Sequence, residues 1–150
     1  IPRTEAKMLI DGYFSMFPKV REYMDIAIEK ARKYGYVTTL LGRRRMLPDI
    51  NSRNPVVRGF SERNAINAPI QGSAADIIKI AMVRIFERFK AEGLKSKMIM
   101  QVHDELNFDV LPVELERVQT IVLDEMKNAY HGHVAMIPSS GSASNWFEAH

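Results

Sequence analysis

The sequence predicts an α+β fold in which helices pack on a small antiparallel sheet. Three observations predict it. Apolar residues recur with helical spacing over residues 19–34, 74–89 and 113–130. Two shorter segments, 36–48 and 98–110, have strand-like patterns around a reversal. The 150 residues suffice for one domain with a hydrophobic core, or for pieces of two.

The composition is that of an ordinary globular protein, with 46% hydrophobic and 26% charged residues. No apolar run approaches the roughly 20 residues of a membrane span. The absence of cysteine excludes disulfides and thiolate metal sites, and it fits a reducing compartment. The chain opens Ile1-Pro2-Arg3, without an initiator methionine or a secretory signal pattern, so we expect a fragment of a longer protein.

Charge is distributed unevenly along the chain. Residues 1–63 hold 13 Lys or Arg against 7 Asp or Glu, a net charge of +6, whereas residues 64–150 hold 8 against 11, a net charge of −3. The basic half suggests a polyanionic partner and the acidic half a cation site. A charge excess of this size is also common on surfaces that bind nothing.

Two helices are expected at the start of the chain. Thr4 followed by Glu5 can begin the first, and Pro18 separates it from a second that runs over residues 19–34 and stops at Gly35, a residue suited to a left-handed cap. We expect their aromatic residues and methionines to be core. The apolar positions are Leu9, Tyr13, Phe14, Phe17, Val20, Tyr23, Met24, Ala27, Ile28 and Ala31.

A short hairpin with a basic arm is expected next. Residues 36–41 are rich in β-branched and aromatic side chains, and Gly42 allows a tight reversal into Arg43, Arg44 and Arg45. These arginines are either a solvated edge strand protected by charge or a set of phosphate contacts. The nearby Arg53, Arg58 and Arg63 favour phosphate contacts.

An unusual polar stripe follows. Arg63, Asn67 and Gln71 are four residues apart and share one helix face, which could hydrogen-bond a nucleic-acid backbone or base edge. Pro69 should interrupt or kink this helix, and the stripe could instead be a set of local caps. We expect a longer helix to begin at Gly72-Ser73 and to end at Gly93. Its buried face would be Ala74, Ile77, Ile78, Ala81, Met82, Ile85, Phe86 and Phe89.

The most informative segment is 98–110. Leu106, Phe108 and Val110 alternate with polar residues, as in a strand with one buried face, while residues 98–102 are almost continuously apolar and should form the more buried arm. The adjacent carboxylates of Asp104 and Glu105 lie at the reversal near His103, and a divalent cation would offset their repulsion. An ordinary solvated hairpin tip explains the same residues.

The last segments are less distinctive. A helix is expected over 113–130 through Leu115, Val118, Ile121, Val122, Leu123 and Met126. His131 and His133 flank Gly132 and are more typical of exposed residues than of metal ligands. Residues 134–137 could form a final strand, and Trp146-Phe147 should pack back to anchor the tail.

Four segments together resemble a known family. They are residues 34–45 (YGYVTTLLGRRR), 63–76 (RNAINAPIQGSAAD), 101–105 (QVHDE) and 145–150 (NWFEAH). In this order they resemble the carboxy-terminal part of a family A DNA polymerase of the bacterial DNA polymerase I type. The resemblance implies part of a polymerase hand, with residues 1–60 belonging to the fingers and residues 61–150 to the palm, including a catalytic hairpin and a terminal strand.

The resemblance also implies a site. Asp104 would hold two Mg2+ ions with assistance from Glu105, and both are the expected catalytic residues. Arg63, Asn67 and Gln71 match positions that contact template and primer, and His103 would lie near the primer terminus. The implied partners are primer-template DNA and deoxynucleoside triphosphates, with no membrane. The implied parent enzyme is a monomer of the bacterial cytoplasm that acts in replication and repair.

The sequence departs from the family's pattern near its end, and part of the family's site is missing from it. The segment 138–144 is more serine-rich than the family's usual ending. The resemblance places the second metal-binding aspartate and the nucleotide-gripping helix before Ile1, so we expect these 150 residues alone not to polymerise.

A His-Asp phosphohydrolase is excluded, because it needs histidines upstream of His103. A single-subunit RNA polymerase would have a related palm, but residues 71–76 (QGSAAD) and the ending 145–150 (NWFEAH) resemble the DNA enzymes more closely. A noncatalytic DNA-binding module remains the alternative.

Overall fold

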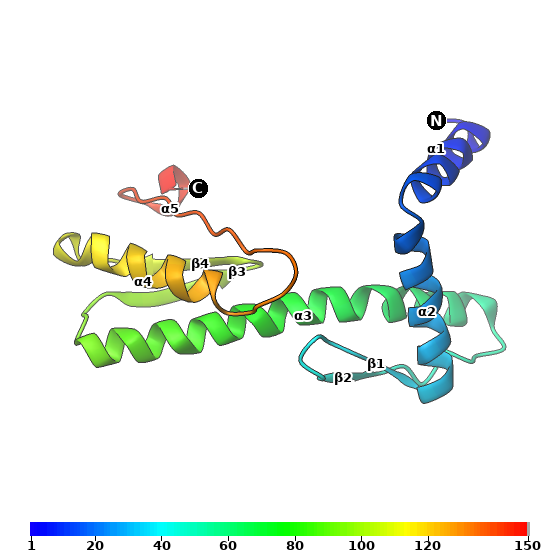
Figure 1. Ribbon diagram of the computed structural model, residues 1–150, viewed down its shortest axis with the longest axis horizontal. Coiled ribbons are helices and arrows are strands. Elements are labelled where there is room, and N and C mark those ends of the chain that lie inside the picture. The colour runs from blue at the N-terminus through cyan, green and yellow to red at the C-terminus, as the bar shows by residue number, and fades with distance from the viewer. Residues whose placement is uncertain (150) are drawn as a thin grey trace. The chain divides into compact units, whose positions relative to one another are not determined.

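The computed structural model describes residues 1–149 and divides into two compact units. The first comprises residues 1–73 and the second begins at Ala74, so the division falls inside a helix. In chain order (Figure 1), the elements are α1 (Arg3–Met16), α2 (Pro18–Tyr34), β1 (Tyr36–Thr38), β2 (Arg44–Met46), α3 (Pro55–Glu92), β3 (Lys97–Val102), β4 (Glu105–Asp109), η1 (Pro112–Glu114), α4 (Leu115–Lys127) and α5 (Trp146–Ala149). The predicted α+β class is confirmed.

Helices α1 and α2 lie where the sequence predicts them, but the burial of α1 differs from the prediction. No residue of α1 is buried, so the expectation that its aromatic residues form core is wrong. The Tyr13 ring instead packs against the rings of Phe14 and Phe17, with centroids 5.4 and 5.2 Å apart. Helix α2 ends as expected at Gly35, whose φ of 76° is left-handed and whose N–H bonds the Ala31 carbonyl oxygen at 2.8 Å.

The basic hairpin is also present in the first unit. Strands β1 and β2 are antiparallel, with Val37 opposite Arg45, and Gly42 turns the chain with a φ of 82°. A two-stranded hairpin this short is at most marginally stable alone, and here a small core packs against it. The buried residues of this core are Ala31, Val37, Leu47, Ile50 and Ala65.

Helix α3 runs without a break from Pro55 to Glu92, so the expected helix start at Gly72-Ser73 is wrong. Pro69 lies inside the helix and removes one N–H donor. The Ser73 hydroxyl does not cap a new helix, since its Oγ donates to the Pro69 carbonyl oxygen at 2.5 Å and accepts the N–H of Leu40 at 2.8 Å. Gly93, with a φ of 69°, ends the helix as predicted.

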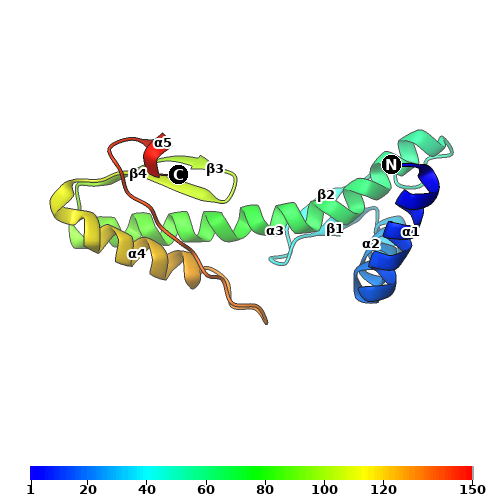
Figure 2. The same ribbon diagram turned by 90° about the horizontal axis from the view of Figure 1, so that it is seen from above.

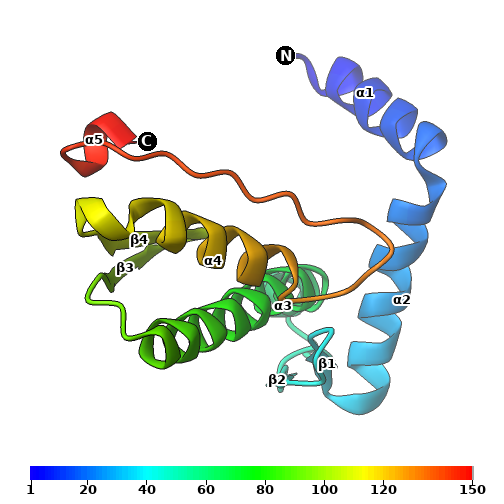
Figure 3. The same cartoon turned by 60° about the vertical axis from the view of Figure 1, so that its left-hand side comes forward.

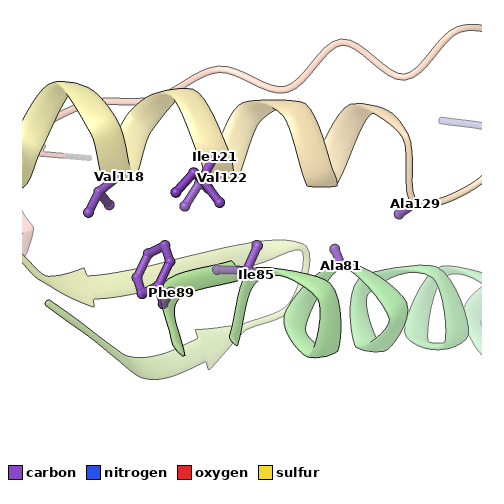
Figure 4. Packing of buried hydrophobic residues seen from close by; sticks show 7 residues of the cluster. All are labelled: Ala81, Ile85, Phe89, Val118, Ile121, Val122 and Ala129. Carbon is purple, nitrogen blue, oxygen red and sulfur yellow. The ribbon is translucent and has the colours of Figure 1, made fainter. Parts of the chain in front are cut away.

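The second unit is built around the later part of α3. Helix α4 and the β3–β4 hairpin lie alongside it (Figure 2). Side chains of α3 and α4 point toward one another (Figure 4), and the Phe89 ring meets the Phe108 ring of β4 with centroids 5.8 Å apart. The buried cluster is Ala81, Ile85, Phe89, Val118, Ile121, Val122 and Ala129. Arg88 also bonds the carboxylates of Asp124 and Glu125, at 2.8 and 3.1 Å.

The burial of α3 and β3 differs from the sequence prediction. Ala74 and Phe86 were expected on the buried face of α3, but both are exposed, Phe86 to 66%, because the face of α3 that packs in the core is narrower than the apolar stripe. Strand β3 was expected to be the more buried arm, yet Ile99 is 64% exposed, whereas most of β4 is half-buried. The pleat turns Ile99 away from the core, and the register shifts between Met98 and Met100.

The expected terminal strand over residues 134–137 is absent. This segment runs without regular structure between α4 and α5 (Figure 3). Val134 and Ile137 are 85% and 90% exposed, and among residues 1–149 no strand pairs with them. Pro138 then lacks the N–H that a ladder needs. No helix of the described residues is both long and apolar enough to cross a bilayer.

Candidate active site and nucleic-acid interface

The acidic pair lies at the reversal of the β3–β4 hairpin, as predicted. Val102 pairs with Glu105, so His103 and Asp104 form a two-residue turn. His103 has a φ of 53°, the left-handed region that such turns require at a central position. Glycine is the usual residue there, and histidine is among the few others enriched in this region. Gln101 supports the turn, since its Nε2 donates to the His103 carbonyl oxygen at 2.9 Å.

The two carboxylates have different surroundings. The Asp104 side chain is exposed, whereas Glu105 is half-buried on β4. The indole Nε1 of Trp146 donates to Glu105 Oε1 at 2.7 Å, so Trp146 packs back as predicted. Phe147 does not, because it is 90% exposed. An open groove of about 1160 Å³, formed by the hairpin, α4 and the tail, includes both carboxylates in its lining.

The pair fits part of a magnesium site. Mg2+ favours hard oxygen ligands and is usually held by one or two carboxylates together with waters and substrate phosphates. Within residues 1–149, no three acidic or histidine side chains gather to form a fuller site. His131 and His133 are both exposed, as expected. The assignment of Asp104 and Glu105 as metal ligands therefore stays a prediction.

The predicted polar stripe lies on the surface of α3. Arg63, Asn67 and Gln71 are all exposed, and their spacing places them on one face. The alternative was a set of local caps around a kink at Pro69, and α3 continues as one helix through that residue. The stripe is thus accessible to a ligand, although its contacts with DNA stay a prediction.

The three consecutive arginines are exposed and take different partners. Arg43 Nη2 donates to the Gly72 carbonyl oxygen at 3.1 Å, Arg45 Nη2 approaches Asn64 Oδ1 at 3.4 Å, and the Arg44 guanidinium lies 4.9 Å from the centre of the Tyr36 ring. A cavity of about 80 Å³ has Arg43, Arg45 and Gln71 in its lining. The structure therefore brings two predicted arginines beside one end of the polar stripe.

A close contact holds the arginine loop on α3. A Cβ added at Gly72 would lie only 2.7 Å from Thr39 Cγ2, so only glycine allows this approach. Leu40 is tied to Ser73 at the same place. Sequence reasoning missed this role of Gly72 and Ser73, as well as that of Gln101. Of these three residues, only Gln101 could have been found from the local sequence, because its amide is two residues from His103 and can reach that residue's carbonyl oxygen.

Comparison with known proteins identifies the family. The profile of DNA polymerase family A matches residues 1–148. DNA polymerase I of Streptococcus pneumoniae serotype 4 is 49% identical over 149 residues, and that of Mycobacterium tuberculosis strain H37Rv is 48% identical over 146. The solved POL domain of Pol1 from M. smegmatis, in complex with DNA primer-template and dNTP, matches 90% of this chain with a TM-score of 0.88 and 47% identity.

This chain belongs to DNA polymerase family A. Its similarity is to enzymes of the DNA polymerase I type, and the predicted resemblance is confirmed. The two relatives are matched over 99% and 97% of this chain, which spans only 17% and 16% of their lengths. The matched region is 24% of the M. smegmatis POL domain chain.

Proposed function

We propose that this chain is the carboxy-terminal portion of a DNA-directed DNA polymerase, which adds deoxynucleotides to a primer 3′ end on a template in replication and repair. The observation that carries the proposal is the pair Asp104 and Glu105 at a hairpin reversal, within a chain that matches the family over residues 1–148. Residues 1–60 would belong to the fingers and residues 61–150 to the palm. The parent enzyme would be a monomer in the bacterial cytoplasm.

The proposed catalytic residues are Asp104 and Glu105. Two Mg2+ ions, when bound, would activate the primer 3′ hydroxyl and neutralise charge on the triphosphate. The exposed Asp104 carboxylate would hold them, and the half-buried Glu105 would assist beside the primer end. Since one carboxylate pair forms only part of a two-ion site, we propose that a further aspartate comes from outside this sequence, and that these 150 residues alone do not polymerise.

The proposed DNA contacts combine four arginines of the basic half of the chain, residues 1–63, with three side chains that follow it. The exposed Arg43, Arg44 and Arg45 would bind phosphates, while Arg63, Asn67 and Gln71 would contact template and primer near the new base pair. His103 would lie close to the primer terminus. The net charge of +6 over residues 1–63 supports this assignment, because phosphate neutralisation dominates affinity for DNA.

A noncatalytic DNA-binding module is the second candidate. The exposed arginines and polar stripe would suffice for it, and no fuller metal cluster is present in the described part of the chain. Substitution of Asp104 separates the two candidates. A binding module would show no nucleotide addition with either wild type or Asp104→Asn, whereas a polymerase would lose turnover in the variant and keep its affinity for DNA.

The DNA-binding part is tested by measuring primer-template affinity against salt in the longest natural chain that contains this sequence. If ~4 to 6 phosphates are contacted, the logarithm of affinity should fall with the logarithm of salt concentration at a slope of roughly −4 to −5. Arg44→Gln should reduce the steepness of that slope by about 1, and Lys79→Gln, on an exposed position of α3, should leave it unchanged. A salt-independent affinity would contradict the proposal.

A further inference from the structure

The proposed function gives no role to the chain ending that resembles the family, residues 145–150. The structure connects this ending to the acidic hairpin. The Trp146 indole, on α5, donates to Glu105 Oε1 at 2.7 Å across 41 residues of sequence. A carboxylate that accepts such a bond is held more firmly than one in water, because a hydrogen bond to a charged acceptor is among the stronger kinds.

The tail around Trp146 is a small structure of its own. Asn145 Oδ1 accepts the N–H of Glu148 at 3.1 Å, and the Ser144 hydroxyl bonds the Glu148 carboxylate at 2.8 Å. Gly141 approaches the Ala149 carbonyl so closely that a side chain would not fit there. The serine-rich segment thus folds back on α5 and limits where the indole can point.

We propose that Trp146 is a positioning residue for Glu105, an inference that rests on the proposed polymerase function. A glutamate has three side-chain torsions, and each must be fixed for its carboxylate to meet a ligand reproducibly. The indole N–H is a donor only, so it suits an ionised carboxylate. By holding Oε1, Trp146 selects the rotamer in which Glu105 faces the groove shared with Asp104.

The contact itself can be tested without any activity. Trp146 is the only tryptophan, so the 15N-labelled 150-residue chain gives a single indole N–H resonance in its NMR spectrum. Glu105→Ala should shift that resonance upfield in the proton dimension. Asp109→Ala, at the other end of β4, should leave it in place. An indole resonance at the same position in wild type and Glu105→Ala would overturn the proposal.

The consequence is tested by steady-state kinetics in the longest natural chain that contains this sequence. Trp146→Phe keeps an aromatic side chain and removes the N–H donor. It should lower kcat roughly 10-fold or more, the usual effect of losing a hydrogen bond that supports a metal-binding carboxylate. The affinity for primer-template should not change. Phe147→Leu, on the same helix but 90% exposed, is the matched control and should match wild type.

A double-mutant cycle distinguishes positioning from other roles. In a Glu105→Ala background, Trp146→Phe should cause no further loss, because the acceptor is already gone. Wild-type kcat in Trp146→Phe, or an equal loss in both backgrounds, would overturn the positioning role. Absence of primer extension in wild type would instead contradict the proposed function, and the positioning role in polymerisation would fall with it, while the NMR result would still decide the contact.

Discussion

Gln101 Nε2 donates a hydrogen bond to the carbonyl oxygen of His103 at 2.9 Å, from the second-to-last residue of β3 to the first residue of the reversal. His103 occupies the left-handed region with a φ of 53°, which costs an L-residue roughly 1–2 kcal/mol. The bond therefore supports the conformation that presents Asp104 and Glu105 side by side.

Loss of this bond should loosen the turn. Gln101→Leu keeps the approximate side-chain size and removes the donor, so we expect destabilisation of about 0.5–1.5 kcal/mol, the usual worth of one hydrogen bond. Chemical denaturation of the chain measures it. His103→Gly should offset part of the loss because glycine adopts positive φ freely. An unchanged midpoint in Gln101→Leu would show that the turn does not depend on the bond.

The close approach of Thr39 to Gly72 predicts that a substitution of Thr39 reverses the effect of a substitution at Gly72. Gly72→Ala should destabilise the first unit, because the new Cβ would lie 2.7 Å from Thr39 Cγ2. Thr39→Ser removes that methyl and keeps the hydroxyl that accepts the Arg43 N–H. In this background Gly72→Ala should become stabilising, by up to about 1 kcal/mol, through helix propensity. Thermal unfolding checks the reversal of sign, and the same sign in both backgrounds would contradict it.

Adjacent residues of α3 should differ sharply in their contribution to stability. Ile85 is 0% exposed and Phe86 is 66% exposed. Ile85→Ala should cost about 2–5 kcal/mol through lost burial and the cavity it leaves. Phe86→Ala should cost far less in this chain, although phenylalanine is the larger residue. Denaturant unfolding of the two variants tests the placement, and equal costs would mean that Phe86 is also packed.

Glu114 should contribute pH-dependent stability. The Ser96 hydroxyl, followed by the N–H groups of Lys95 and Ser96, donates to its carboxylate and holds its pKa below the ordinary value of 4.5. A lowered pKa means that the contribution is present above 4.5 and is lost as pH falls through the lower, folded-state value.

Glu114→Gln tests that sign. Its melting temperature should lie below that of wild type at pH 7, and the difference should shrink as pH falls below 4.5 toward 3. Glu116→Gln, a neighbouring glutamate on the first turn of α4, serves as the control. A difference that stays constant across this range would show that the Glu114 carboxylate is not the group responsible.

The sequence predicted local structure well where one residue determines it. Gly35 and Gly93 end helices, and the reversal falls at His103-Asp104, because left-handed backbone and strand alternation are read from neighbouring residues. The continuity of α3 could not be read in this way. Pro69 ordinarily signals an interruption of a helix. The contact of Ser73 with Leu40, which is 33 residues away in sequence, is likewise not visible in the local pattern.

Burial was the least predictable property. The apolar spacing of α1 indicates a helix but does not say what covers it, and none of its residues is buried in this structure. Ile99 and Ile137 were likewise expected in strands with partners, yet they are 64% and 90% exposed. The sequence predicts that Asp104 and Glu105 lie at the hairpin tip. The hydrogen bond between Glu105 and Trp146 is seen only in the folded chain, because 41 residues separate the two in sequence.

Single-turnover nucleotide addition decides whether the β3–β4 hairpin is a catalytic site. The longest natural chain that contains this sequence is bound to primer-template, and Mg2+ with one deoxynucleotide is added. Asp104→Asn should bind primer-template as wild type does but add the nucleotide at least about 100-fold more slowly, the scale of losing one transition-state-stabilising group. Asp109→Asn should react normally. An Asp104→Asn enzyme that extends the primer at the wild-type rate would contradict the assignment of this hairpin as the catalytic site.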